Sequence, residues 1–99
     1  MSTTVRIDRY VVDVLMRDIV GHDARPSAYV IYLYFATRSR RATALSHAEL
    51  ASATGLSKRG VQLGIAWLKR RGLIDARREK PTAVPFYRVL KPWRHKPRR

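Results

Sequence analysis

Three side chains near the start of one predicted helix have types and spacing that suit recognition of base pairs. Lys58, Arg59 and Gln62 share the polar face of this helix, which would begin after Ser57. Lysine and arginine donate hydrogen bonds to O6 and N7 of guanine, and glutamine pairs with N6 and N7 of adenine. We therefore expect these side chains to contact base edges, with Lys69 further along the same face. The simpler alternative is a solvated helix face.

Two predicted helix starts would add contacts to phosphate groups. Ser46 with His47, and Ser57 with Lys58, place free backbone amides beside polar side chains that suit an anion. Plain helix capping is the alternative, and both roles can hold together. Other candidate contacts come from the predicted hairpin and the C-terminal tail: Arg77, Arg78, Lys80, Arg94, Lys96, Arg98 and Arg99.

The sequence offers little that suits catalysis or a metal centre. It contains no cysteine, which excludes disulfides, thiol catalysis and cysteine-based zinc sites. The histidines, His22, His47 and His95, lack the spacing of known metal motifs. Tyr87 as a nucleophile that cleaves DNA would need a catalytic domain for which 99 residues leave no room. We expect no enzyme activity, no cofactor and no metal ion.

The positive charge is confined to one part of the chain. Residues 1–37 hold four arginines and four aspartates, whereas residues 38–99 hold 17 Lys or Arg against three acidic residues, which accounts for the net charge of +14. Such a one-sided field attracts a polyanion and accelerates encounter with it. Nucleic acid is the favoured partner, and an acidic membrane or an acidic protein is the alternative. With no apolar targeting segment or membrane span, we expect a soluble, cytoplasmic protein associated with the nucleoid.

The elements that would position these residues are mostly helical and fit one domain. Apolar residues spaced by three and four predict an N-terminal helix over residues 5–20, ended by Gly21. The run at 28–36 is apolar throughout, and Pro26 before it favours a helix that continues into the basic residues at 36–41. A helix that is apolar on every side must be covered on every side.

The second half of the chain predicts two short helices and a hairpin. Ser46 and Glu49 have capping-box spacing, which predicts a helix over 47–53, and Gly55 would close it. A second helix would run from Ser57 to Gly72. Residues 73–78 and 84–90 are strand-like around a polar loop and predict a β-hairpin. The fold class is therefore mainly α with a small β-hairpin: one domain over 1–90, and a basic, flexible tail over 91–99.

The pattern LAxxxGLSxxxVxxxIxxLxxxGLI, from Leu50 to Ile74, resembles the winged helix-turn-helix domains of bacterial and phage DNA-binding regulators. It also resembles the DNA-binding domains of some plasmid and phage replication initiators. The resemblance covers roughly residues 26–90. It implies a three-helix core plus a wing, here with an additional N-terminal helix.

The resemblance implies that the protein binds double-stranded DNA as a transcriptional regulator. The helix after Ser57 would enter the major groove, while wing and tail contact the backbone or the minor groove. A plasmid or phage replication or partition protein is the alternative, followed by RNA binding. A winged helix that serves as a protein-interaction module is the alternative of another class.

Two glycines in the proposed recognition helix need a reason, because glycine weakens a helix. Gly60 stands where similar domains often have threonine or serine, and its missing side chain would let the backbone approach a phosphate or a base. Gly64 stands where helices would pass most closely. We therefore expect Gly64 to be structural and include Gly60 among the DNA-binding residues.

Leu63 and Trp67 form an apolar pair outside the predicted core stripe. Two interpretations stay open: the pair belongs to an interface with the tryptophan as anchor, or the N-terminal helix or Trp93 covers it. With Tyr29 and Leu33 they are the candidate interface residues of a homodimer that forms through the N-terminal helices.

Overall fold

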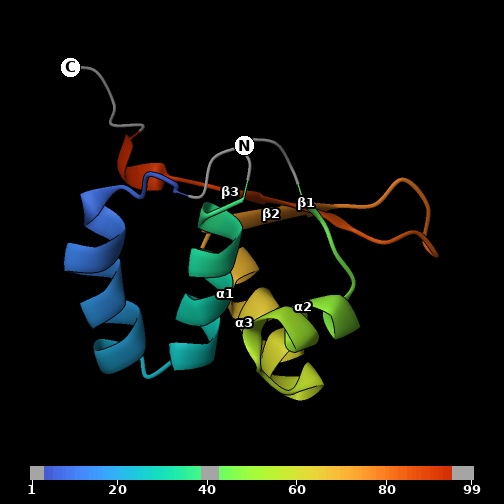
Figure 1. Ribbon diagram of the computed structural model, residues 1–99, viewed down its shortest axis with the longest axis horizontal. Helices are drawn as coiled ribbons and strands as arrows, with labels where there is room; N and C mark the ends of the chain where they lie inside the picture. The colour runs from blue at the N-terminus through green and yellow to red at the C-terminus, as the bar shows by residue number, and fades with distance from the viewer. Residues whose placement is uncertain (1–3, 39–42, 95–99) are drawn as a thin grey trace.

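The computed structural model describes residues 4–38 and 43–94 of the 99-residue chain. The protein is mainly helical with a small antiparallel hairpin, as predicted. Figure 1 shows α1 in the centre, with the N-terminal helix η1 on one side and α2 and α3 on the other, below the strands. The elements in chain order are η1 (Val11–His22), α1 (Pro26–Ala36), β1 (Thr43–Ala44), α2 (His47–Thr54), α3 (Lys58–Arg70), β2 (Ile74–Arg77), β3 (Phe86–Val89) and the 3₁₀ turn η2 (Pro92–Arg94).

Helix α1 is the centre of the hydrophobic core. The side chains of Ile31 and Tyr32 are fully buried, and the ring of Phe35 stacks on Tyr87 of β3 with 5.1 Å between centroids. The Tyr32 hydroxyl donates to the carbonyl of Leu90 at 2.9 Å. The all-apolar run is therefore covered by η1, by α2 and α3, and by β3, as its composition required.

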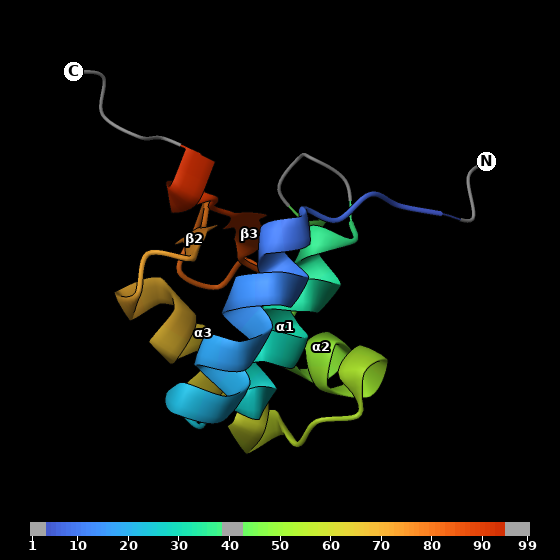
Figure 2. The same ribbon diagram turned by 90° about the vertical axis from the view of Figure 1, so that its left-hand side faces the viewer.

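Helix η1 differs from the expected helix over 5–20 in both bounds and geometry. It is a π-helix from Val11 to His22, with the i→i+5 bond from the Asp23 amide to the Asp18 carbonyl at 2.7 Å. It packs across α1 (Figure 2) and buries Val11 and two residues at spacings of four. The prediction of an earlier start was wrong because Asp8 is engaged with the C-terminal segment, and Gly21 does not end the helix.

Helix α1 also ends earlier than predicted. It stops at Ala36, and the hydroxyl of Thr37 donates to the Tyr34 carbonyl at 2.7 Å. The amide of Arg38 bonds to Phe35, three residues back, so the chain tightens into a turn there. The expected basic extension at 36–41 is therefore not helical at Thr37 and Arg38, and 39–41 lie outside the described residues.

Local signals fixed both ends of α2 and the start of α3 as predicted, whereas α3 stops at Arg70, two residues before Gly72. The Ser46 hydroxyl accepts from the Glu49 amide at 3.1 Å, and the Glu49 carboxylate accepts from the Ser46 amide at 2.8 Å. Gly55 closes α2 in the left-handed region, with φ of 81°. The Ser57 hydroxyl accepts from the Gly60 amide at 2.9 Å and caps α3.

The strands form a small sheet in the order β1-β3-β2. Strands β2 and β3 are the predicted hairpin, with Ile74 opposite Val89 and Arg77 opposite Phe86. Strand β1 was not predicted, because two residues are too short for any alternation to be visible in the sequence.

Helices α1 and α3 meet at Gly64. A Cβ atom placed there would lie 2.6 Å from Cδ1 of Ile31 and 3.3 Å from the Cα atom of Ala28. Gly64 is therefore needed for the close approach of the two helices, which confirms its structural role.

Candidate nucleic-acid interface

The first turn of α3 is open to solvent on its outer side. Lys58 and Arg59 are exposed, Gln62 lies exposed one turn later, and Lys69 is exposed near the far end. On the opposite face, Val61 and Leu68 are fully buried. The amphipathic pattern of this helix therefore places the predicted base-reading side chains outward, where they can approach a partner.

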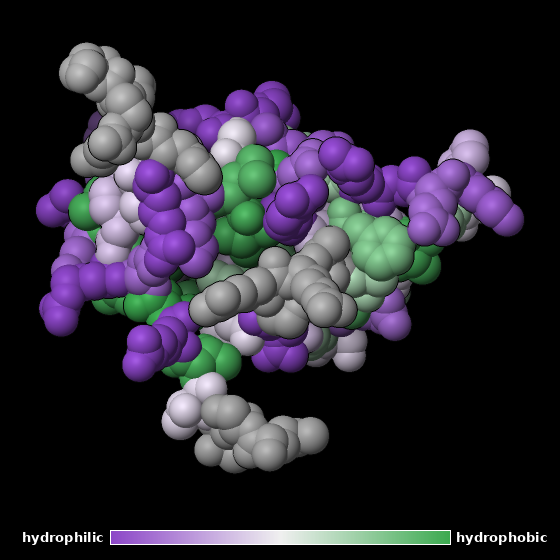
Figure 3. Space-filling model, turned by 90° about the horizontal axis from the view of Figure 1, so that it is seen from above, coloured by the Kyte–Doolittle hydropathy of each residue, from purple (hydrophilic) through white to green (hydrophobic). Residues whose placement is uncertain are grey.

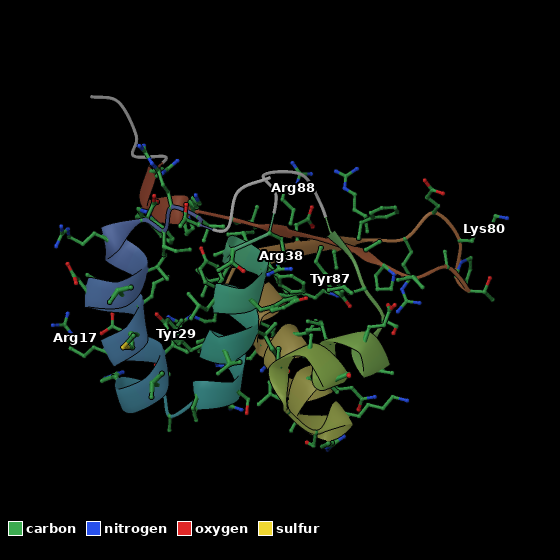
Figure 4. The ribbon with its side chains drawn as sticks, in the orientation of Figure 1. Arg17, Tyr29, Arg38, Lys80, Tyr87 and Arg88 are labelled. Carbon is green, nitrogen blue, oxygen red and sulfur yellow. The ribbon has the colours of Figure 1, made fainter. Side chains whose placement is uncertain are left out.

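The end of β2 and the hairpin loop carry cations, of which Arg78 lies beside the starts of α2 and α3. Arg77 is exposed and lies 3.7 Å from the carboxylate of Asp75. Lys80 extends from the loop at the end of the molecule farthest from η1 (Figure 4). Seen from above, hydrophilic side chains cover the tip of this end, and others lie over the rest of the same face (Figure 3). Arg78 is held to the loop, because its guanidinium donates to the Pro81 carbonyl at 3.1 Å.

An open hollow of about 250 Å³ lies between the start of α2, the start of α3 and the hairpin loop. Its ionisable lining residues are His47, Lys58 and Arg78, all of them basic, and Thr82 adds a hydroxyl. Burial is the main reason why the pKa of His47 lies below its usual value, and the charges of Arg78 and Lys58 lower it further. Ser46 and His47, which were predicted to contact phosphate, thus line the same hollow as Lys58 and Arg78.

Gly60 lies on the side of α3 that faces α1. It is half-buried, and a Cβ atom there would lie 3.2 Å from the Ser57 hydroxyl oxygen and 3.8 Å from that of Ser27. It lines a smaller hollow of about 140 Å³ together with Leu63 and Gly64. The missing side chain thus leaves room beside the helix cap rather than on the outward face.

The start of the C-terminal tail is fixed to the N-terminal segment. Arg94 pairs with the Asp8 carboxylate, and the indole nitrogen of Trp93 donates to the same carboxylate at 3.3 Å. Trp93 also stacks on Tyr10 with 4.5 Å between centroids. The hydrogen bond from Arg94 is the main reason why the pKa of Asp8 lies below its usual value, with Lys91 adding to it.

This arrangement places Arg94 beside η1, at the opposite end of the molecule from the hairpin loop (Figure 1). The first residues of the predicted tail therefore pack against the domain, with Pro92–Arg94 in a 3₁₀ turn. The remaining tail candidates, Lys96, Arg98 and Arg99, lie outside the described residues. Sequence reasoning missed Asp8, and no local pattern could have found it because its partner is 86 residues away.

Two of the four candidate interface residues are not on the surface. Trp67 is only 7% exposed and lies beneath the guanidinium of Arg71, 5.0 Å from the ring centroid. Tyr29 is buried between η1 and α1 (Figure 4), and its hydroxyl donates to the Val11 carbonyl at 3.0 Å. The prediction that these two form an interface was wrong, because both side chains belong to the hydrophobic core.

The other two candidates are more accessible: Leu63 is 48% exposed and Leu33 is half-buried. Trp93 covers Tyr10 instead of the pair on α3.

The described residues contain no group of three or more histidine, aspartate or glutamate side chains that could hold a metal ion. Within residues 4–38 and 43–94, no helix has the length and apolar character needed to cross a membrane. Comparison with known proteins found no family model that matches the chain, and no curated protein or solved structure that is similar to it.

Proposed function

We propose that this chain is a winged helix-turn-helix domain that binds double-stranded DNA as a transcriptional regulator. In this proposal α2 and α3 are the two helices of the motif, α3 enters the major groove, and the β2–β3 hairpin is the wing. The observation that carries the proposal is the exposed first turn of α3, where Arg59 faces solvent and Lys58 lines the hollow that also contains Arg78 of the hairpin. A regulator of this kind would act in the cytoplasm, at the nucleoid.

The charge distribution supports the same partner. All of the net charge of +14 lies in residues 38–99, which include the three elements around the 250 Å³ hollow. If about six phosphates are neutralised, a plot of log K against log salt should have a slope of about −5. A slope near zero in a duplex-binding titration would refute the electrostatic part of the proposal.

The role of α3 is tested by replacing one exposed arginine. Arg59→Ala should weaken binding to a preferred duplex by about 1–3 kcal/mol and relax the preference at one base pair, since a bidentate contact to guanine is lost. Arg9→Ala is the matched control, because Arg9 is also exposed but follows Asp8, which pairs with Arg94 at the end of the molecule opposite the hairpin loop (Figure 1). Equal losses from both variants would mean that only the total charge matters.

Selection of bound fragments from a random DNA pool would identify the preferred sequence and any half-site symmetry. A replication or partition role uses the same docking surface, so arrays of repeats among the targets would favour it. Weak affinity for every duplex, even in low salt, would instead favour a protein-interaction module.

We further propose that the protein is a homodimer that associates through η1. The outer face of this helix exposes Val12, Met16 and Val20, three apolar residues spaced by four. Light scattering at high micromolar concentration should give a dimer mass that Met16→Lys reduces to a monomer mass. A monomeric wild-type protein would reject this assembly.

A further inference from the structure

The hollow between α2, α3 and the hairpin loop has the chemistry of a site for a single phosphate group. Three cationic or protonatable side chains reach it from three separate elements: His47 from α2, Lys58 from α3 and Arg78 from the hairpin loop. Its other lining residues, which include Thr82 and Pro85, carry no charge. A hollow lined by cations with no acidic residue among them favours an anion.

Nothing within the described protein neutralises this cluster. Arg78 donates to the carbonyls of Pro81 and Ala83, which orients its guanidinium but does not cancel its charge. Glu49, the acidic residue on α2, accepts from the Ser46 amide in the capping box and does not line the hollow. The positive charge is therefore held in place without a counterion from the chain.

His47 is the residue of this cluster whose charge can change near neutral pH. The groups that face it are Lys58 from α3 and Arg78 from the hairpin loop, and both disfavour a third positive charge. A phosphate anion in the hollow would offset these two charges, so that protonated His47 becomes favourable. Occupation of the site and protonation of His47 therefore support each other.

We propose that His47, Lys58 and Arg78 form a site for one phosphate of bound DNA, and that His47 takes up a proton when the site is filled. This inference rests on the proposed DNA binding and adds a proton linkage to it. The free protein holds the pKa of His47 below its usual value, and the complex raises it. The affinity for DNA therefore rises as the pH falls from the pKa of His47 in the complex to the lower pKa of His47 in the free protein.

The direct test needs no variant. The pKa of His47 is measured by NMR titration of the wild-type protein alone and bound to a short mixed-sequence duplex in low salt. We expect the pKa of His47 to rise by about half a unit or more in the complex, so that protonation of His47 strengthens DNA binding by a total of about threefold or more. An unchanged or lower pKa in the complex would overturn the inference.

Variants of His47 and His22 distinguish protonation in this hollow from a general effect of pH on DNA binding. The association constant of the wild type should increase at least about twofold from about pH 7.5 to about pH 6. His47→Gln should remove this increase, whereas the control His22→Gln should keep it, because His22 is exposed at the end of η1 beside Asp23. A pH response that persists in His47→Gln would overturn the inference.

Arg78→Met provides a readout that a merely structural role would not produce. Removing this cation should raise the pKa of His47 in the free protein and lessen its rise on binding. An unchanged pKa of His47 in this variant would also overturn the inference. If the wild type binds duplex DNA without a proton linkage, only this inference fails. If it binds no duplex at any pH, the proposed function fails as well.

Discussion

Replacement of Gly64 by alanine tests the closest contact in the fold. The new methyl group would lie 2.6 Å from Cδ1 of Ile31 and 3.3 Å from the Cα atom of Ala28. Ile31 is fully buried and Ala28 contributes backbone, so neither can yield cheaply. Overpacking of this kind costs about 1–3 kcal/mol, whereas alanine in a helix gains about 1 kcal/mol over glycine. We expect a net loss of about 1 kcal/mol, which lowers the Tm by about 4–8 °C in a domain of this size.

Thermal and urea denaturation followed by circular dichroism measure this loss, and the matched control is Gly21→Ala. A Cβ atom at Gly21 meets no atom within 4 Å, so the control should gain about 0.5 kcal/mol from reduced unfolded-state entropy. Ile31→Val in the Gly64→Ala background removes the clashing methyl group and should cost less than it does in the wild type. A Gly64→Ala variant as stable as Gly21→Ala, or additive effects in the double variant, would refute the packing argument.

Three further predictions concern single contacts. Asp8→Asn should lower the Tm at neutral pH because Arg94 loses its ion pair. Since the pKa of Asp8 is lowered in the folded state, the difference in Tm between wild type and variant should be full above about pH 4 and should vanish as the pH falls through the pKa of the folded protein. Melting curves at a series of pH values measure this difference. Tyr29→Phe should cost about 1 kcal/mol in urea denaturation, because the Val11 carbonyl loses its buried donor; no loss would mean that water replaces the hydroxyl. Ser46→Ala should cost about 1 kcal/mol by removing the α2 cap, and Ser46→Asp should restore most of it; equal stability of both variants would contradict the capping role.

Local signals in the sequence predicted much of this fold. The capping box of α2, the left-handed Gly55 and the cap of α3 at Ser57 each involve residues within a few positions of one another, so the sequence displays them directly. The hairpin was predicted for the same reason, because its two strands are close in the chain. The exposed polar face of α3 follows from helical periodicity alone.

Contacts between distant segments could not be predicted in this way. Trp67 lies outside the simple apolar stripe of α3, yet it is buried. Gly64 lets α3 approach α1 closely, so a wider face of α3 is buried than its apolar stripe alone predicts. The guanidinium of Arg71 also lies over the indole ring of Trp67 and pairs with Asp23. The hollow also depends on tertiary packing, so the sequence presented His47, Lys58 and Arg78 as three separate candidate contacts.

The pairing of Asp8 with Arg94 has a consequence for the order in which the molecule can assemble. Asp8 leaves the ribosome 86 residues before its partner, so a nascent chain must hold η1 without this anchor until the hairpin has been synthesised. Val11 and Leu15 already offer η1 an apolar face against α1 during that interval. The Asp8 contacts of the N-terminal segment therefore form only after Trp93 and Arg94 have been synthesised, which couples translation of this C-terminal segment to completion of the N-terminal one.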